Sequence, residues 1–264
     1  MSKALIGSSG FVGTTLLGQF GGFSHCYRSS NIESIRGETF DLVVCAGAPA
    51  QKWIANADPD GDRANLDRLW ESLQQLRCRR FVLISTVDVY PSPTGVDELT
   101  HIDPQQLQAY GRHRYRLENR VRSLFPVHHV MRLPGLVGKG LRKNALFDLK
   151  HGNQVDRIDP RGRMQFYDMS LLWGDVQSTI AAGLSVVNLA AEPLLMGDVA
   201  RCAFEVELNP INGGFVPDYR METNHAACFG TEGRYRLSRA QSMEAIIEYA
   251  RSADLPSGAP PWQC

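Results

Sequence analysis

The sequence lacks an excess of charge of either sign, because its 28 lysine and arginine residues balance 28 aspartate and glutamate residues. Proteins that bind nucleic acid or an anionic membrane surface use a positive field to attract the polyanion. The balance therefore argues against nucleic acid and membrane surfaces as partners. We expect a small-molecule substrate instead.

Long apolar runs are also missing, and no stretch approaches the about 18 residues of a membrane-spanning helix. Near the N-terminus, the apolar run Ala4-Leu5-Ile6 ends at Gly7, which is too early for the core of a signal peptide. The six cysteines form no CxxC pair. Scattered cysteines are typical of buried thiols in a reducing compartment. We therefore predict a cytoplasmic protein.

Strand-like apolar runs alternate with amphipathic stretches of helical periodicity. The predicted strands are Ala4–Gly7, Phe40–Ala46, Phe81–Thr86, Val127–Leu133 and Val186–Ala190. The predicted helices are Val12–Phe20, Arg63–Leu76, Ala109–Leu124, Trp173–Ala182 and Ala240–Arg251. This alternation predicts an α/β fold, a doubly wound parallel sheet of Rossmann type with helices on both faces.

Two segments interrupt the alternation, Pro134–Met169 and Leu194–Tyr235, which mix glycine, proline and basic residues. We expect residues 1–133 and about 170–193 to form the core. Residues from about 134–169 and 194–264 then form a small lobe that covers the substrate and carries the last helix. The tail Leu255–Cys264, rich in proline and glycine, is expected to be loosely ordered.

A glycine-rich segment, Gly7-Ser8-Ser9-Gly10-Phe11-Val12-Gly13, lies directly between the first predicted strand and the first predicted helix. In this context the first glycine permits a tight turn and the second lets backbone N–H groups approach a pyrophosphate. The third allows the helix to pack closely on the strand. The position of the segment predicts dinucleotide binding. The predicted binding residues of this turn are Gly7, Ser9, Gly10, Phe11, Val12 and Gly13.

No carboxylate stands roughly 20 residues after the first glycine, where an NAD-preferring protein binds the ribose hydroxyls. The sequence there is Tyr27-Arg28-Ser29-Ser30-Asn31. Arg28 can pair with a 2′-phosphate, and the hydroxyls of Ser29 and Ser30 can add hydrogen bonds. This predicts NADP(H) as the preferred cofactor, with NAD(H) still open. The alternative is that Arg28 is a solvated loop residue.

Four further segments follow the glycine turn in a characteristic order. They are Ala46-Gly47-Ala48, Ser85-Thr86-Val87-Asp88, Tyr110-Gly111-Arg112-His113-Arg114 and Arg132-Leu133-Pro134-Gly135. The first, second and fourth end predicted strands, and the third lies on a predicted helix. Together with the glycine turn they resemble the extended short-chain dehydrogenase/reductases, the NAD(P)-dependent epimerase/dehydratase family, over most of the chain.

The resemblance implies a catalytic Ser or Thr, a Tyr and a Lys, and these positions are occupied by Thr86, Tyr110 and Arg114. A phenol has a pKa of about 10, so it needs a nearby cation to act near neutrality. Position 114 shares a helix face with Tyr110. Arg114 keeps the charge, but its planar fork differs from an ammonium in size and direction. Asp88 lies near the place where dehydratases of the family carry a further acid, and the alternative is a turn-stabilising carboxylate.

The resemblance also implies cofactor contacts near two of the strand ends, at Ala46, Gly47, Ala48, Leu133, Pro134 and Gly135. For the proposed catalytic pair, the alternatives are a packed helix residue for Tyr110 and an ordinary strand end for Thr86. His128-His129 and His225 with Cys228 lack the further ligands of a zinc site, so we predict no metal.

The implied function is an NADP(H)-dependent oxidoreductase, epimerase or dehydratase acting on a sugar-like or other carbonyl or hydroxyl metabolite. The cofactor would carry the hydride, and Tyr110 would act as acid and base. The alternative is a dinucleotide-binding regulator or structural subunit with little or no catalysis, because Arg114 replaces the lysine. A homodimer is compatible with the resemblance, although Tyr115–Leu124 contains three arginines, which is a high charge for an interface core.

The assignment of Arg28 to a 2′-phosphate can be tested by substitution. Hydrogen bonds to a charged group contribute roughly 1.5–3 kcal/mol. Arg28→Ala should therefore weaken NADPH binding by about 10- to 100-fold and leave NADH binding nearly unchanged. Calorimetric titration of both reduced cofactors checks this, and an unchanged preference would remove Arg28 from the cofactor site.

Overall fold

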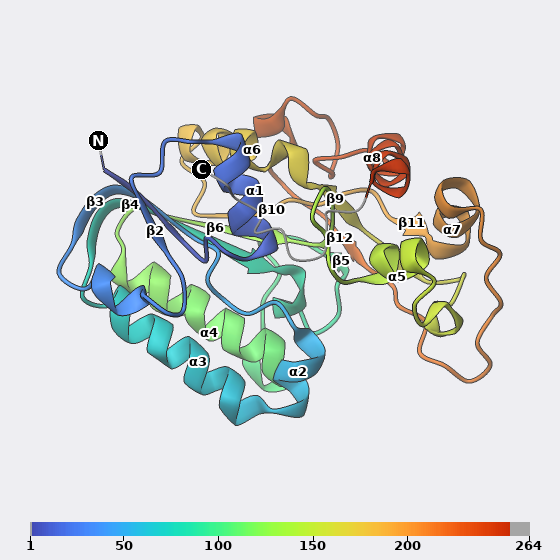
Figure 1. The fold of residues 1–264 in the computed structure, drawn as a ribbon, viewed down its shortest axis with the longest axis horizontal. Helices are drawn as coiled ribbons and strands as arrows, with labels where there is room; N and C mark the ends of the chain where they lie inside the picture. Colours follow the sequence, from blue (N-terminus) through green and yellow to red (C-terminus); the bar gives the residue numbers. More distant parts are fainter. Residues whose placement is uncertain (1, 254–264) are drawn as a thin grey trace. The chain divides into compact units, whose positions relative to one another are not determined.

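The computed structural model describes residues 2–253, so the predicted loose tail Leu255–Cys264 lies outside the described residues. A six-stranded parallel sheet forms the centre of the first of two compact units (Figure 1). Its strands are β10 (Val186–Asn188), β6 (His128–Leu133), β4 (Arg77–Thr86), β3 (Thr39–Cys45), β1 (Lys3–Ile6) and β2 (His25–Tyr27), in this spatial order.

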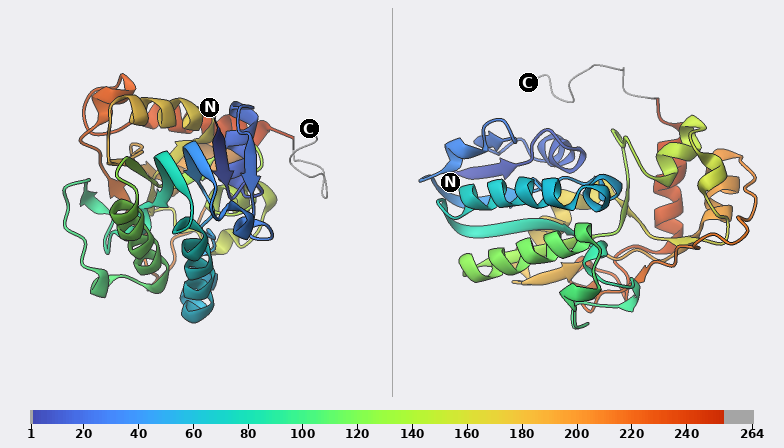
Figure 2. Two further views of the ribbon diagram at one scale, coloured as in Figure 1. Left: turned by 90° about the vertical axis from the view of Figure 1, so that its left-hand side faces the viewer. Right: turned by 90° about the horizontal axis from the view of Figure 1, so that it is seen from below.

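Helices cover both faces of this sheet, with α1 and α6 on one face and α3 and α4 on the other (Figure 1). Their bounds are α1 (Phe11–Gln19), α3 (Pro59–Leu73), α4 (Ala109–Leu124) and α6 (Leu172–Ala181). On their shared face, α3 and α4 lie side by side (Figure 2). Strand β3 ends in three consecutive residues that are fully buried, Val43, Val44 and Cys45, because helices exclude water from both of its sides. The predicted doubly wound α/β fold is confirmed.

Strand β1 lies between β2 and β3, so the connection from β1 runs to β2 on one side and the next connection crosses from β2 to β3 on the other side. Ligands of such sheets bind outside the carboxyl ends of the strands at this switch point. Gly7 follows β1 there with a positive φ of 82°. A Cβ at Gly7 would collide with the carbonyl oxygen of Ala46, which follows β3. A Cβ at Gly13 would collide with the carbonyl oxygen of Gly7, so both glycines are required by backbone contact.

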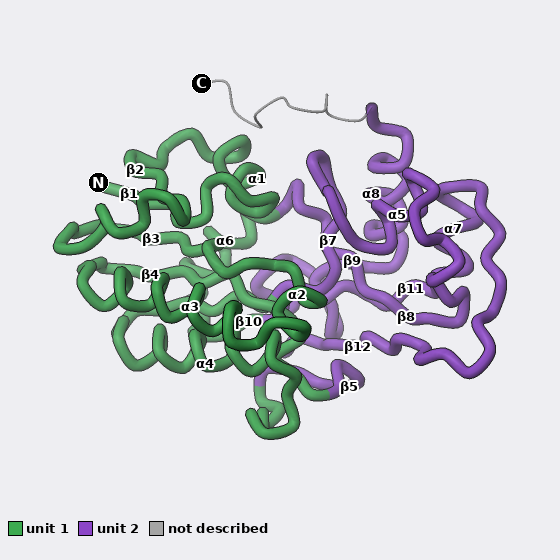
Figure 3. Tube along the Cα trace, turned by 60° about the horizontal axis from the view of Figure 1, so that its bottom comes forward, with its two compact units in different colours: residues 1–91, 99–132, 172–187 green, residues 92–98, 133–171, 188–264 purple. Residues whose placement is uncertain are grey.

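The second unit consists of Ser92–Glu98, Leu133–Leu171 and the described chain from Asn188 onward (Figure 3). Its helices are α5 (Ala145–His151), α7 (Met196–Phe204) and α8 (Arg239–Arg251). Its strand pairs are β7 (Gly135–Val137) with β9 (Phe166–Asp168), β8 (Arg163–Met164) with β11 (Leu194–Leu195), and β5 (Thr94–Val96) with β12 (Arg220–Met221). The sequence analysis did not foresee that Ser92–Glu98 belongs to this unit.

Several short elements were missed because they contain too few residues to show a period. They include β2, whose three residues pair with β1, and the helix α2 (Lys52–Ala57). The short 3-10 helices are η1 (Ile32–Ile35), η2 (Val87–Val89), η3 (Pro104–Gln106), η4 (Val155–Arg157), η5 (Met169–Leu171) and η6 (Ala226–Phe229). Within residues 2–253, no helix has both the length and the apolar character that crossing a membrane requires.

The predicted helix Arg63–Leu76 was placed several residues too late. The helix α3 begins at Pro59, and the side chain of Asp58 caps it by accepting a hydrogen bond of 3.0 Å from the backbone N–H of Gly61. An aspartate cap followed by proline is a local start signal, which hydrophobic periodicity does not detect. Helix α4, by contrast, has the predicted bounds.

The backbone contact at Gly13 predicts a large difference between two alanine substitutions in helix α1. Gly13→Ala forces the helix away from Gly7, and overpacking of this kind costs about 1–3 kcal/mol. Gly18→Ala, in the same helix with open space around it, should stabilise the protein by about 0.5–1 kcal/mol. Denaturant unfolding measures both free energies. Equal effects of the two substitutions would contradict the close packing at Gly13.

Candidate active site

The glycine turn is anchored to the end of β2. The backbone N–H groups of Gly7 and Ser8 donate to the carbonyl oxygen of Tyr27 at 2.9 and 3.1 Å. The hydroxyl of Ser8, a buried residue, donates to the same oxygen at 3.2 Å. The turn is therefore held next to the residue that precedes Arg28.

The amino end of α1 is open to a ligand. Its first helical hydrogen bond runs from the N–H of Thr14 to the carbonyl oxygen of Gly10 at 2.8 Å. Among the described residues, no side chain caps this end, and the first turn carries no acidic residue. The N–H groups of Phe11, Val12 and Gly13 precede the first helical bond and have no acceptor within the helix. Such an end favours a phosphate group, so the turn fits the pyrophosphate of a dinucleotide.

Arg28, Ser29 and Ser30 follow β2 and are exposed to solvent. Asn31 shapes this loop, because its side-chain oxygen accepts a hydrogen bond of 2.6 Å from the backbone N–H of Arg28. The loop leaves the carboxyl end of the strand that neighbours β1. Its role in binding a 2′-phosphate remains a prediction.

The two other predicted cofactor segments belong to different units. Ala46, Gly47 and Ala48 directly follow β3 in the first unit, and the N–H of Ala46 donates to Ile6 at 2.9 Å. Leu133, Pro134 and Gly135 belong to the second unit. A Cβ at Gly135 would meet the carbonyl oxygen of Gln165 at 2.7 Å, so packing within that unit already accounts for this glycine.

The structure brings Thr86 and Tyr110 together. Thr86 is the last residue of β4 and Tyr110 the second residue of α4, and the Thr86 side chain lies close enough to the phenol to lower its pKa. Tyr110 is 7% exposed. A Cβ at Gly111 would collide with the carbonyl oxygen of Asp88, so glycine permits α4 to approach η2 closely. The predicted pair therefore forms one site within the first unit.

Arg114 does not direct its charge at the Tyr110 hydroxyl. Its two terminal nitrogens donate to the two carboxylate oxygens of Asp62 at 2.6 and 2.8 Å, and one also donates to Pro49 O at 2.5 Å. The guanidinium carbon lies 3.9 Å from the centre of the Tyr110 ring. Arg114 thus packs on the ring face and is committed to a buried ion pair.

Burial raises the pKa of Tyr110 above its usual value, and Asp88 raises it further. Arg114, Thr86 and Lys52 act in the opposite direction, but burial outweighs them. Arg114 lowers the pKa of Tyr110 as expected, but by less than burial raises it, so the net shift in the cofactor-free chain is away from neutrality. Tyr110 stays protonated at neutral pH, which suits a proton donor better than a base.

Asp62 and His113 were not recognised from the sequence. His113 Nδ1 lies 2.8 Å from Asp62 Oδ2, so Asp62 has two partners on α4. Burial alone would raise the pKa of Asp62, but hydrogen bonds from Arg114 and His113 outweigh it and hold the pKa below its usual range. Asp62 lies one position before the predicted helix Arg63–Leu76, so the sequence did not indicate that its side chain faces α4.

Lys52 was also missed, and it changes the interpretation of Asp88. The Lys52 ammonium lies 2.7 Å from Asp88 Oδ1. The 3-10 turn at this point is capped instead by Thr86, whose hydroxyl accepts a hydrogen bond of 3.2 Å from the N–H of Asp88. The Asp88 carboxylate therefore belongs to an ion pair beside the site. Position 52 lies outside every predicted element, so the sequence carried no signal for it.

A second buried network positions helix α4. Arg132 donates to both oxygens of the fully buried Glu118 at 3.1 and 2.6 Å, and to the Tyr90 hydroxyl at 2.7 Å. The Ser85 hydroxyl donates to Glu118 at 2.5 Å. Ser85 is thus committed to Glu118, and its neighbour Thr86 is the hydroxyl residue that meets Tyr110.

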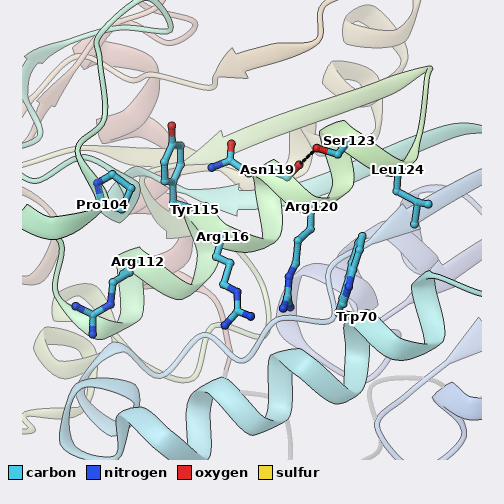
Figure 4. A pocket seen from close by; sticks show the side chains of 9 residues that line it. All are labelled: Trp70, Pro104, Arg112, Tyr115, Arg116, Asn119, Arg120, Ser123 and Leu124. Atoms are coloured by element: carbon cyan, nitrogen blue, oxygen red, sulfur yellow. Dashed lines mark hydrogen bonds between the residues drawn. The ribbon is translucent and has the colours of Figure 1, made fainter.

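A hollow of about 640 Å³ lies along the surface of α4, with Trp70 as its lining residue from α3 (Figure 4). It is lined by Trp70, Pro104, Arg112, Tyr115, Arg116, Asn119, Arg120, Ser123 and Leu124. Arg116 and Arg120 extend from α4 toward α3, and Arg120 pairs with Asp67 at 2.6 Å. Neither Thr86 nor Tyr110 lines it. A homodimer through α4 would bring these arginines of two copies together, and it remains a prediction.

Several other histidine, arginine and cysteine side chains form local contacts or are shielded from solvent. His129 Nδ1 lies 2.7 Å from the carbonyl oxygen of Leu184. Arg161 donates to both oxygens of Asp159 at 2.9 and 2.6 Å. Burial raises the pKa of Cys45 to about 11 and that of Cys78 to about 12. Across residues 2–253, no group of three or more His, Cys, Asp or Glu side chains could hold a metal ion.

No protein-family model matches the chain, and no curated protein matches its sequence. Solved structures do match. UDP-glucose 4-epimerase from Thermotoga maritima, solved with UDP-glucose, has a TM-score of 0.71 at 15% identity, covering 95% of this chain and 99% of that chain. The chain has the fold of the extended short-chain dehydrogenase/reductases. The resemblance predicted from the motifs is thus confirmed at the level of the fold.

Two further structures with this fold contain nicotinamide cofactors. The dTDP-4-dehydrorhamnose reductase from Bacillus anthracis, solved with NADP, has a TM-score of 0.72 at 13% identity, covering 94% of this chain and 98% of that chain. WbmG from Bordetella bronchiseptica, solved with NAD and UDP, has a TM-score of 0.68 at 12% identity, covering 94% of this chain and 93% of that chain.

The buried pair of Asp62 and Arg114 should dominate the stability of the α3–α4 contact. Their side chains are 4% and 3% exposed. Removing one partner of a buried pair costs about 3–5 kcal/mol, so Asp62→Ala should destabilise the protein by this amount. Asp67→Ala, which removes the more exposed partner of Arg120, should cost at most about 1 kcal/mol. Urea unfolding at neutral pH compares the two.

The pH dependence of unfolding provides the control. Because the folded-state pKa of Asp62 lies below its unfolded value, its contribution is present above the unfolded pKa of about 3.9 and is lost as the pH falls. The gap in stability between wild type and Asp62→Ala should therefore narrow in acid. A constant gap from neutral to acid pH would contradict the ion-pair account.

Proposed function

We propose that this chain is an NADP(H)-dependent enzyme that transfers hydride to or from a carbonyl or hydroxyl carbon of a sugar-like metabolite. One observation carries this proposal. The uncapped glycine turn at the switch point and the neighbouring pair of Thr86 and Tyr110 occur in the same unit, on a fold shared with NAD(P)-dependent epimerases and reductases.

The cofactor is held in this proposal by the turn from Gly7 to Gly13, with the pyrophosphate against the amino end of α1. Structures of the same fold contain either NADP or NAD. The absence of a carboxylate in the run Tyr27–Asn31, and the exposed Arg28 within it, favour the 2′-phosphate of NADP(H).

When bound, the dinucleotide supplies or accepts the hydride. Thr86 orients the phenol of Tyr110 and donates a hydrogen bond to the substrate oxygen. Tyr110, which is protonated at neutral pH because burial raises its pKa, gives its proton to that oxygen as the carbonyl becomes an alcohol. Reduction needs a proton donor, so the raised pKa favours a reductase over an enzyme that begins by oxidation.

The substrate class follows from the same likeness. Two of the structures described above contain UDP-glucose or UDP. We assign substrate binding to the second unit, as the sequence predicts for residues 134–169 and 194–264. Nucleotide-linked 4-keto sugars and the corresponding alcohols are therefore the first compounds to test.

A second candidate function is dinucleotide binding without turnover. The observation that favours it is that position 114, where the family resemblance implies a lysine, carries an arginine whose two terminal nitrogens are both bound to Asp62. Both candidates require NADP(H) binding. They differ in whether the protein converts a substrate, with Tyr110 as the acid.

The proposal predicts a specific effect of Tyr110→Phe. A positioned acid or base contributes typically 10²–10⁴-fold to the rate. Tyr110→Phe should lower kcat by about that factor while NADPH affinity, measured by fluorescence titration, changes less than about threefold. Thr86→Val should also lower kcat with little effect on affinity, because it removes the hydroxyl that orients the phenol.

The outcome of a substrate panel separates the candidates. Stoichiometric NADPH oxidation supports a reductase, and turnover without net cofactor change supports an epimerase or dehydratase. Binding of NADPH with no turnover on any sugar nucleotide supports the binding-only protein. If neither reduced cofactor binds at millimolar concentration, both candidates are wrong.

A further inference from the structure

Helix α2 brings two polar side chains to the Tyr110 site. Lys52 and Asn56 are four residues apart and therefore share one face of the helix. The side-chain oxygen of Asn56 accepts a hydrogen bond of 3.0 Å from the backbone N–H of Tyr110, and its amide donates to Gln108 Oε1 at 2.8 Å. This face of α2 is thus fixed to the first turn of α4.

One turn before Asn56, the ammonium of Lys52 donates a hydrogen bond of 2.7 Å to Asp88 Oδ1. Asp88 is the middle residue of η2, whose backbone touches α4 at Gly111. The side chain of Asp88 is 19% exposed, whereas that of Lys52 is 44% exposed. Lys52 therefore has a fixed partner beside Tyr110 and keeps access to solvent.

The charged groups around Tyr110 come from four elements. Lys52 on α2 and Asp88 in η2 form one ion pair, and Arg114 on α4 and Asp62 on α3 form the other. Arg114 is buried, bound through both terminal nitrogens and stacked on the ring face. Lys52 is the partly exposed cation of the four groups. The charge of Arg114 lowers the pKa of Tyr110, and that of Lys52 lowers it by a smaller amount.

We propose that Lys52, held by Asp88, is a second cation that supports Tyr110 in this chain, in addition to Arg114 at the position where the family resemblance implies a lysine. This inference rests on the proposed function, because only an acting phenol needs such support. Lys52 is a positioning residue, since it acts through the charge state of Tyr110.

The chemistry of this assignment is simple. When Tyr110 gives its proton to the substrate oxygen, the phenol becomes a phenolate with one negative charge. The ammonium of Lys52 favours that charge without losing its own proton. A proton from solvent then returns to the phenolate before the next turnover. Asp88 holds the ammonium in place throughout.

The test is a titration of the Tyr110 phenol in the protein without cofactor. Difluorotyrosine is introduced at position 110 alone, because its phenol ionises at lower pH and its fluorine signal reports a single residue. Lys52→Met, which removes the charge and keeps the apolar stem, should raise the phenol pKa by about one unit, a tenfold change in the ionisation equilibrium. Lys52→Arg should restore most of the wild-type value.

Two controls make the result specific. Lys3→Met removes a lysine that does not influence Tyr110 and should leave the titration unchanged. NADPH binding is measured on every variant in parallel. If wild type does not bind NADPH, the proposed function is wrong; if wild type binds NADPH but the titration does not change in Lys52→Met, only this inference is wrong.

Kinetics provide a second measurement. With an active substrate, Lys52→Met should lower kcat about tenfold and shift the pH profile of kcat, and Lys52→Arg should restore both. An unchanged fluorine titration in Lys52→Met overturns the proposal.

Discussion

The ion pair between Arg114 and Asp62 determines how this site is arranged. Two buried charges are tolerated because the contact is bidentate and His113 supplies a further hydrogen bond to the carboxylate. The pair joins α4 to α3, and the guanidinium rests on the ring of Tyr110. Position 114 is thereby committed to structure. A cation that is not bound in this pair must come from another element, and we propose Lys52 on α2.

The glycine turn imposes the second constraint. Gly7 and Gly13 let β1, α1 and the end of β3 approach to backbone contact at the switch point of the sheet. The same contact leaves the amino end of α1 uncapped by any described side chain. A stable core and an anion site therefore arise from the same few residues. Thr86 and Tyr110 belong to the same unit, so the residues that we propose for hydride transfer occur on one scaffold.

The sequence predicted features that depend on local context. Helix α4 has the predicted bounds, the glycine turn lies between a strand and a helix, and Thr86 meets Tyr110. Helical spacing also placed Arg114 on the face of Tyr110, but spacing does not reveal that Asp62 on α3 binds the guanidinium. Lys52 lies on a helix of six residues, too short for a periodic signal. Partners brought from distant elements were therefore the part that sequence reasoning missed.

A crystal structure of the protein grown with NADPH tests the central claim most directly. The account predicts pyrophosphate oxygens within hydrogen-bond distance of the N–H groups of Phe11 and Val12, with the nicotinamide next to the Tyr110 hydroxyl. NADPH bound in the hollow beside Trp70 and Arg116, with the glycine turn empty, would contradict it.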